Sequence, residues 1–177
     1  MYEPALLSKS EVEINYSKAF LSLGELIIAD TPTNVWTVLG SCVSVVLYNP
    51  RLKVSALCHA QLAETDVFGK KTRGVLDEKY FDIAVKDDFR YVGCSIKYML
   101  EQFLARGINK NEICASIYGG ANVIALFTHK IGTINSIAAV EVLEKYGIRI
   151  IKKDIGGEKS RTIRHYSDTG VTHVRVL

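Results

Sequence analysis

The stretch VWTVLGSCVSVVLYNP, residues 35–50, holds two apolar runs that are separated by a glycine turn and closed by an Asn-Pro pair. Its Val, Leu and aromatic residues favour β-strands over Val35 to Leu39 and Cys42 to Tyr48. The Asn-Pro turn folds the chain back, so the next apolar run, Val54 to Leu62, can pair with the strand before it. The stretch therefore predicts neighbouring strands at the centre of the fold.

The remaining elements lie on both sides of these strands. Apolar residues at spacings of three and four predict a helix from Tyr91 to Arg106 that ends at Gly107, and a second helix fits Thr133 to Tyr146. Further strands are predicted at Glu25 to Ala29, Ile113 to Tyr118, Ile148 to Lys152 and Val171 to Val176. Strands and helices in this order predict an α/β (α+β) fold built on a mixed sheet structure.

Two segments fall outside this pattern. Residues 1–20 are polar with a weak period, and we predict a poorly fixed N-terminal arm before a single domain over residues 21–177. Residues 64–90 are rich in Lys, Asp, Gly and Thr and form the longest loop-like region. Loops of this length in a compact domain are usually functional or mobile, and this one directly follows His59. It is therefore a candidate flap that contacts a substrate.

The composition restricts the classes of function. The 177 residues include 22 basic and 19 acidic side chains, and this small excess gives no support for binding to nucleic acid. No apolar run approaches the roughly 18 residues that span a bilayer, and no targeting segment is evident at the start. We therefore expect a soluble, cytoplasmic protein without membrane insertion. Thiols stay reduced in that compartment, so the four cysteines are expected to be free.

Cys42 and His59 are the residues best suited to chemistry. The turn Gly40-Ser41 before Cys42 can bend the backbone, keep bulk away from a substrate carbonyl and direct N–H groups at an oxyanion. His59 lies in a mostly apolar strand, and strand pairing can bring it near Cys42. An imidazole can then take the thiol proton and return it to a leaving group. A buried structural cysteine and a core histidine remain alternative interpretations.

A cysteine–histidine pair usually needs a third group that orients the imidazole. Thr37 can supply a hydroxyl or a carbonyl for this purpose, although a strand residue without that role is an equal alternative. Cys58 adjoins His59, so their side chains point to opposite faces of the strand. Cys58, Cys94 and Cys114 lack the spacing of metal ligands and are predicted to be core residues. His129, His165 and His173 have no acidic or cysteine partners at a recognisable spacing and are predicted to have surface or structural roles.

Several short motifs occur in a characteristic order along the chain. They are Thr37-Val38-Leu39-Gly40-Ser41-Cys42-Val43, then His59, Gly119-Gly120-Ala121, Ile131-Gly132 with Asn135, Asp154-x-Gly156-Gly157 with Arg161, and Thr169-Gly170. With these motifs the chain resembles the CheD family of chemoreceptor glutamine deamidases, from about residue 23 to the C-terminus. The glycine pairs alone match no phosphate-binding pattern and indicate tight turns.

The resemblance implies a mechanism, a fold and partners. Cys42 would be the nucleophile, His59 the base and acid, and Thr37 the residue that fixes the imidazole, with no metal or organic cofactor required. The fold would consist of β-sheets packed as a sandwich with helices on the outside. The substrate would be a glutamine on the cytoplasmic helical bundle of a methyl-accepting chemotaxis receptor, and a CheC-type phosphatase would be a binding partner.

Departures from the family pattern keep other functions open. Gly93 stands where the family has an aspartate, and Ile134 stands where an arginine is common. These changes are compatible with a catalytically weak or inactive module that binds a chemotaxis phosphatase or a receptor. A thiol enzyme with another substrate, such as a methylesterase-like or transglutaminating protein, is a second alternative.

Overall fold

A computed structural model describes residues 15–63, 89–123 and 130–177 of the chain. The strands are β1 (Ser17–Phe20), β2 (Leu26–Ala29), β3 (Thr33–Leu39), β4 (Val43–Asn49), β5 (Val54–Cys58), β6 (Cys114–Gly119), β7 (Arg149–Ile155), β8 (Arg161–Tyr166) and β9 (Val171–Val176). The helices are α2 (Val92–Ala105), the 3-10 helix η1 (Lys110–Glu112) and α3 (Ile131–Lys145). Every predicted strand and helix is present, with ends that differ by a few residues.

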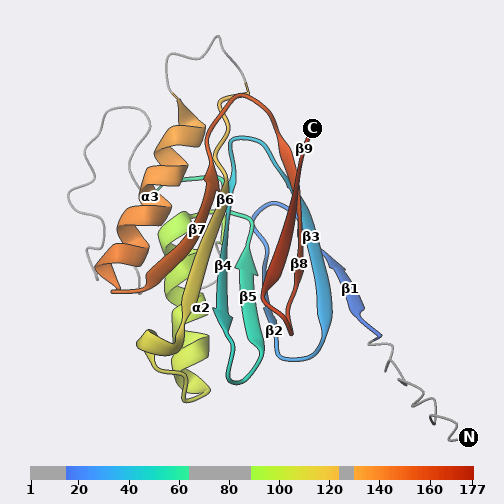
Figure 1. Cartoon of the computed structure of the whole chain (residues 1–177). Helices are drawn as coiled ribbons and strands as arrows, with labels where there is room; N and C mark the ends of the chain where they lie inside the picture. Colours follow the sequence, from blue (N-terminus) through green and yellow to red (C-terminus); the bar gives the residue numbers. More distant parts are fainter. Residues whose placement is uncertain (1–14, 64–88, 124–129) are drawn as a thin grey trace, which may run out of the picture.

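The strands form two sheets, and the helices cover one of them. The five-stranded sheet has the order β2-β5-β4-β6-β7, and the four-stranded sheet has the order β1-β3-β8-β9. Both are mixed, because β6 and β7 are parallel, as are β1 and β3, while the other pairs are antiparallel. In Figure 1, α2 and α3 lie on one side of the five-stranded sheet and the four-stranded sheet lies on the other. The predicted sandwich with helices on the outside is confirmed.

Two apolar cores hold these three layers together. The larger core joins the helices to the five-stranded sheet and includes Ile96, Met99 and Phe103 of α2. The smaller core lies between the sheets and includes Val35 and Leu57. Because alternate residues of a strand point to opposite faces, β4 and β5 contribute to both cores. Polar side chains are also buried in the fold, among them Thr37 and His59.

The sequence pattern fails to predict β8. Its inward positions are Arg161, Ile163 and His165, all buried, so that two of the three core-facing residues are polar. The alternation of apolar and polar residues that marks a half-buried strand is therefore missing. The terminal nitrogens of Arg161 are paired locally, since Nη1 donates to the Asp154 side chain at 2.5 Å and Nη2 donates to the Gly156 carbonyl, while its buried Nε has no partner among the described residues.

The predicted N-terminal arm is wrong in its last residues. Residues 1–14 lie outside the described part, but β1 pairs in parallel with β3 over four positions, and the Phe20 ring lies 4.4 Å from the Trp36 ring between centroids. Ladder hydrogen bonds and this aromatic contact fix a segment whose side chains are mostly exposed and show no apolar period. A single domain over residues 21–177 remains a prediction.

The predicted flap falls mostly on residues 64–88, which lie outside the described part of the chain, so it remains a prediction. The described residues on either side of that segment pair with one another. The N–H groups of Gln61 and Leu62 both donate to the Arg90 carbonyl, and the Val92 N–H donates back to the Leu62 carbonyl. The described residues that flank this segment, Gln61 and Leu62 before it and Arg90 and Val92 after it, are therefore held together by backbone hydrogen bonds.

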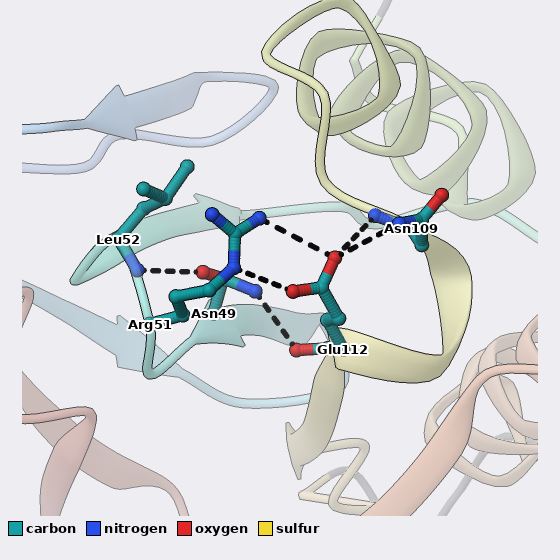
Figure 2. Close-up of polar contacts among 5 residues, drawn as sticks. All are labelled: Asn49, Arg51, Leu52, Asn109 and Glu112. Atoms are coloured by element: carbon teal, nitrogen blue, oxygen red, sulfur yellow. Dashed lines mark hydrogen bonds and ion pairs between the residues drawn. The ribbon is translucent and has the colours of Figure 1, made fainter.

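A polar network ties the β4–β5 turn to η1 (Figure 2). Asn49 Nδ2 donates to the Glu112 carbonyl at 3.0 Å, and Asn49 Oδ1 accepts from the Leu52 N–H at 2.8 Å. The Glu112 carboxylate accepts from Arg51 Nε at 2.6 Å and from the Asn109 N–H at 2.9 Å. The hydrogen bond from Arg51 is the main reason that the pKa of Glu112 falls to about 2. This network fixes the end of β4 that is remote from Cys42.

Candidate active site

Thr37, Cys42 and His59 gather on the side of the five-stranded sheet that faces the other sheet. Along β3, Val35, Thr37 and Leu39 are buried while the residues between them are more exposed, so Thr37 points inward and is only 1% exposed. His59 directly follows β5 and is 7% exposed. Cys42 directly precedes β4, is half-buried, and packs against the inter-sheet core. Of the three residues predicted as catalytic, Thr37 and His59 are in contact, and Cys42 lies on the same face of the sheet as His59.

The hydrogen bonds of Thr37 determine the tautomer of His59. Thr37 Oγ1 donates its only hydrogen to the Leu21 carbonyl at 2.6 Å. The same Oγ1 lies 2.8 Å from His59 Nδ1, and that nitrogen also lies 3.3 Å from the Leu21 carbonyl. Both oxygens can only accept from His59, so Nδ1 must carry the ring hydrogen. Nε2 then keeps its lone pair and has the electronic structure of a general base.

Strand pairing places Cys42 and His59 on one face of the sheet. Val43 and Ala60 form an antiparallel bridge, so Cys42 stands opposite Gln61 and diagonal to His59. Diagonal neighbours have Cα atoms about 7–8 Å apart and point the same way, which a side chain as long as histidine can bridge. The arrangement can therefore transfer a proton between the thiol and the imidazole once the substrate is in place.

Burial keeps both groups uncharged at rest. Burial raises the pKa of the Cys42 thiol above its ordinary value, and it lowers the pKa of His59, with the Leu21 carbonyl opposing that shift in part. A neutral thiol beside a neutral imidazole is the state from which a base-assisted attack starts. Burial raises the pKa of Cys58 to about 11. Cys58 packs in the core under the helices, on the opposite face from His59 as expected, and is an inert thiol.

The turn before Cys42 is fixed by backbone contacts with the end of β6. The Ala121 N–H donates to the Gly40 carbonyl at 2.8 Å, and the Gly120 N–H donates to the Cys42 carbonyl at 2.7 Å. Gly119 has a φ of +100°, and a Cβ there would overlap the Cys42 carbonyl oxygen. By contrast, a Cβ on Gly40 would meet no atom closer than 3.7 Å. The glycine that the turn requires is therefore Gly119 at the end of β6 rather than Gly40.

Helix α3 packs closely on the same turn. A Cβ on Gly132 would overlap the Gly120 carbonyl, and a Cβ on Gly120 would overlap Ser136 Oγ. Ser41 is half-buried, and its carbonyl accepts a hydrogen bond from the side chain of Asn135 at 3.0 Å. The glycine pair and the Ile-Gly motif thus mark the point where a helix approaches the backbone beside Cys42.

The sequence does not predict that the backbone carbonyl of Leu21 contacts His59. The Leu21 carbonyl contacts both Thr37 and His59, yet a backbone oxygen leaves no signal in the residue types. Leu21 lies beside β3, where its N–H donates to the Trp36 carbonyl at 3.0 Å. This position brings the Leu21 carbonyl oxygen to the imidazole of His59. The orienting group is therefore a hydroxyl and a carbonyl together.

Within residues 15–63, 89–123 and 130–177, no three His, Cys, Asp or Glu side chains gather as metal ligands would. In the same part of the chain, no helix has the length and the apolar character needed to cross a lipid bilayer.

Comparisons with known proteins give one consistent family. The family model described as "CheD chemotactic sensory transduction" matches residues 77–176. Over 153 residues the chain is 34% identical to a probable chemoreceptor glutamine deamidase CheD 2 of Geobacter sulfurreducens. The aligned residues make up 85% of this chain and 84% of that protein. A probable chemoreceptor glutamine deamidase CheD of Archaeoglobus fulgidus is 30% identical over 157 residues, or 87% of this chain and 90% of that protein.

Among solved structures, the hypothetical protein YfiH of Bacillus licheniformis matches with a TM-score of 0.42 and 13% identity. That match covers 73% of this chain and spans half of the YfiH chain.

Proposed function

Since this chain belongs to the CheD family, we propose that it hydrolyses specific glutamine side chains of methyl-accepting chemotaxis receptors to glutamate, with Cys42 as nucleophile. The observation that best supports this proposal is the hydrogen bonding of His59, which leaves Nε2 unprotonated on the face that it shares with Cys42. A core histidine without a function needs no free nitrogen on that face. The named relatives are probable glutamine deamidases, and their names indicate the reaction to test.

The proposed reaction has two halves. In the first, His59 Nε2 takes the thiol proton, Cys42 Sγ bonds to the carboxamide carbon of the glutamine, and the imidazolium returns the proton to the departing ammonia as the C–N bond breaks. A thioester remains. In the second half, His59 takes a proton from water, the hydroxide attacks the thioester carbon, and the C–S bond breaks. The thiolate is reprotonated, and the product is glutamate.

Thr37, Gly40 and Ser41 have supporting roles in this proposal. Thr37 orients the imidazole and stabilises the imidazolium that forms during the reaction, because its oxygen accepts from Nδ1. The turn at Gly40 and Ser41 presents backbone N–H groups to the oxyanion of the tetrahedral intermediate. The hydrogen bonds that the carbonyls of this turn accept fix its backbone. The N–H groups of the turn are then held in place as well and need no rearrangement during the reaction.

Receptor glutamines lie on cytoplasmic helical bundles, so we propose that the protein acts in the cytoplasm. We also propose a CheC-type phosphatase as a partner. The family resemblance supports both proposals, and binding measurements with the purified phosphatase would test the second one. The domain that carries these functions is proposed to extend over residues 21–177, preceded by β1.

Mass spectrometry of purified receptor cytoplasmic fragments tests the reaction. Incubation with the wild-type protein should convert specific glutamines to glutamates, a mass increase of about 1 Da each, with release of ammonia. Cys42→Ala should abolish the conversion. Cys58→Ala is the matched control, because it removes the adjacent thiol on the opposite face and should leave the conversion intact. A folded wild-type protein that converts no glutamine in any receptor from the same cell would refute the deamidase and favour the binding module.

A further inference from the structure

The regular pairing of the strands that carry the proposed catalytic residues stops beside the nucleophile. Val43 and Ala60 exchange two backbone hydrogen bonds, of 2.8 and 2.9 Å. Hydrogen-bonded pairs alternate along an antiparallel ladder, so the next one would join Leu62 to Ser41. There the Leu62 N–H donates to the Arg90 carbonyl instead, at 3.0 Å. The ladder therefore ends at the Val43–Ala60 bridge, and beyond it a group outside the ladder is needed to hold the segment of Cys42 against that of Gln61.

One side chain bridges the two segments. Asn135 of α3 is 1% exposed, and its Nδ2 donates to the Ser41 carbonyl at 3.0 Å and to the Gln61 carbonyl at 2.8 Å. Ser41 directly precedes Cys42, and Gln61 is two residues beyond His59. Each hydrogen of one amide nitrogen is thus used on a different catalytic segment.

The helix that carries Asn135 is itself firmly placed. Gly132 and Gly120 approach so closely that neither has room for a methyl group. Asn122 Nδ2 donates to Thr133 Oγ1 at 2.9 Å, which joins the first turn of α3 to the end of the β6 segment. A bridge anchored on a fixed helix can hold two strands at a constant distance.

We infer that Asn135 is a positioning residue that sets the separation of the Cys42 thiol and the His59 imidazole. The inference rests on the proposed function, in which these two groups exchange a proton. Aspartate has the shape of asparagine but offers no N–H, and its charge would face two carbonyl oxygens. Because a displacement of about 1 Å can cost about 100-fold in rate, loss of the bridge should impair chemistry more than substrate binding.

The test compares Asn135→Asp and Asn135→Ala with Ser136→Ala. Ser136 is the matched control, because it is the adjacent buried residue of α3 and its hydroxyl donates to Gly132 within the same helix, at 2.9 Å. Deamidation of a receptor fragment should show kcat lowered about 100-fold by both Asn135 variants, with KM nearly unchanged. Ser136→Ala should keep kcat close to the wild-type value.

A second measurement needs no substrate. The rate at which iodoacetamide alkylates Cys42 is followed against pH by mass spectrometry in wild type, Asn135→Ala and His59→Ala. If Asn135 sets the separation, its variant should lose the influence of the imidazole and move towards the profile of His59→Ala. Wild-type and Asn135→Ala profiles that coincide would overturn the inference, even if deamidation is confirmed. A shifted profile without any deamidation would support the positioning role and refute only the proposed substrate.

The remaining outcomes also decide the question. If the profiles of wild type and His59→Ala coincide, there is no coupling for Asn135 to set, and the inference fails. If both Asn135 variants fail to fold while Ser136→Ala folds, Asn135 is needed for stability alone, and the positioning role is overturned as well.

Discussion

His59 and His165 are both buried between the sheets, and the same hydrogen-bonding arrangement fixes each ring with opposite results. Thr37 donates to the Leu21 carbonyl and therefore accepts from His59 Nδ1. Ser55 donates to the Ser167 carbonyl at 2.9 Å and therefore accepts from His165 Nε2 at 2.8 Å. The first ring is the Nδ1–H tautomer and the second is the Nε2–H tautomer.

The difference between the rings lies in the second nitrogen. His165 Nδ1 lies 2.9 Å from Thr172 Oγ1, which completes the hydrogen bonding of a ring with 0% exposure. His59 Nε2 keeps its lone pair, and the ring lies on the face of the sheet that also holds Cys42. A fully satisfied histidine stabilises a fold, whereas a histidine with one nitrogen available can exchange a proton. Burial alone therefore does not identify a catalytic histidine.

Replacing each ring by alanine should separate the two roles most clearly. His59→Ala should lower deamidation about 10⁴-fold, because the general base is lost. His165→Ala should leave kcat nearly unchanged and lower the free energy of unfolding by about 3 kcal/mol, through a cavity and the loss of the ring's hydrogen bonds with Ser55 and Thr172. Ammonia release and urea unfolding would measure the two effects. Equal losses of activity in two folded variants would show that the comparison is wrong.

Removing the hydroxyl that orients His59 should have the next largest effect. Thr37→Val keeps the shape of the side chain but cannot accept from Nδ1, so both tautomers become accessible and deamidation should fall about 100-fold. Thr37→Ser retains the oxygen and should recover most of the rate. If the valine variant is as active as wild type, the Leu21 carbonyl is sufficient to orient the ring.

Acid should destabilise the protein through His165. Burial lowers the pKa of His165 from 6.5 to about 4. The folded protein therefore binds this proton more weakly than the unfolded chain does. The neutral ring makes its full contribution to the free energy of unfolding above pH 6.5, and this contribution is lost as the pH falls to about 4. At about 1.4 kcal/mol per pH unit, the loss is about 3 kcal/mol.

Urea unfolding between pH 7 and 4 would measure this loss. His165→Gln is the control, since it removes the titrating group and should flatten the pH dependence of the unfolding free energy while lowering its value at pH 7. An equally steep dependence in the variant would assign the acid sensitivity to other groups.

The smallest effect should come from the hydroxyl that holds His165. Ser55→Ala leaves the Nε2–H of a buried ring without its acceptor, which should lower the free energy of unfolding by about 1–2 kcal/mol. Deamidation should be unchanged, because Ser55 faces His165 rather than Cys42. A change in stability within about 0.5 kcal/mol would indicate that the ring finds another acceptor.

The strands around Cys42 could be predicted because their residues are apolar on both faces, as expected for the centre of a sandwich. Thr37, Cys42 and His59 could be selected because their chemistry is unusual in such strands, and strand pairing then brings two of them together. The Gly119-Gly120 turn was also predictable, although the sequence gives no indication that a helix is the reason for it.

Other features depend on contacts between residues far apart in the chain. The Leu21 carbonyl lies beside His59 only because the segment after β1 runs along β3. β8 could not be recognised because its inward side chains include Arg161, which is paired with Asp154 of β7, and His165, whose ring is hydrogen-bonded to Ser55 of β5 far away in the chain. The register of strands decides such contacts, and residue types within one strand do not encode it.

The contact between Phe20 and Trp36 has a practical consequence. Trp36 is the single tryptophan of the chain, and its ring is 37% exposed on the outer face of β3, directly before Thr37 on the inner face. Its fluorescence should therefore report whether β1 remains docked on β3, without adding a label. A substitution that only impairs the chemistry of Cys42 should leave the emission spectrum unchanged, whereas one that loosens the sandwich should shift it to longer wavelength.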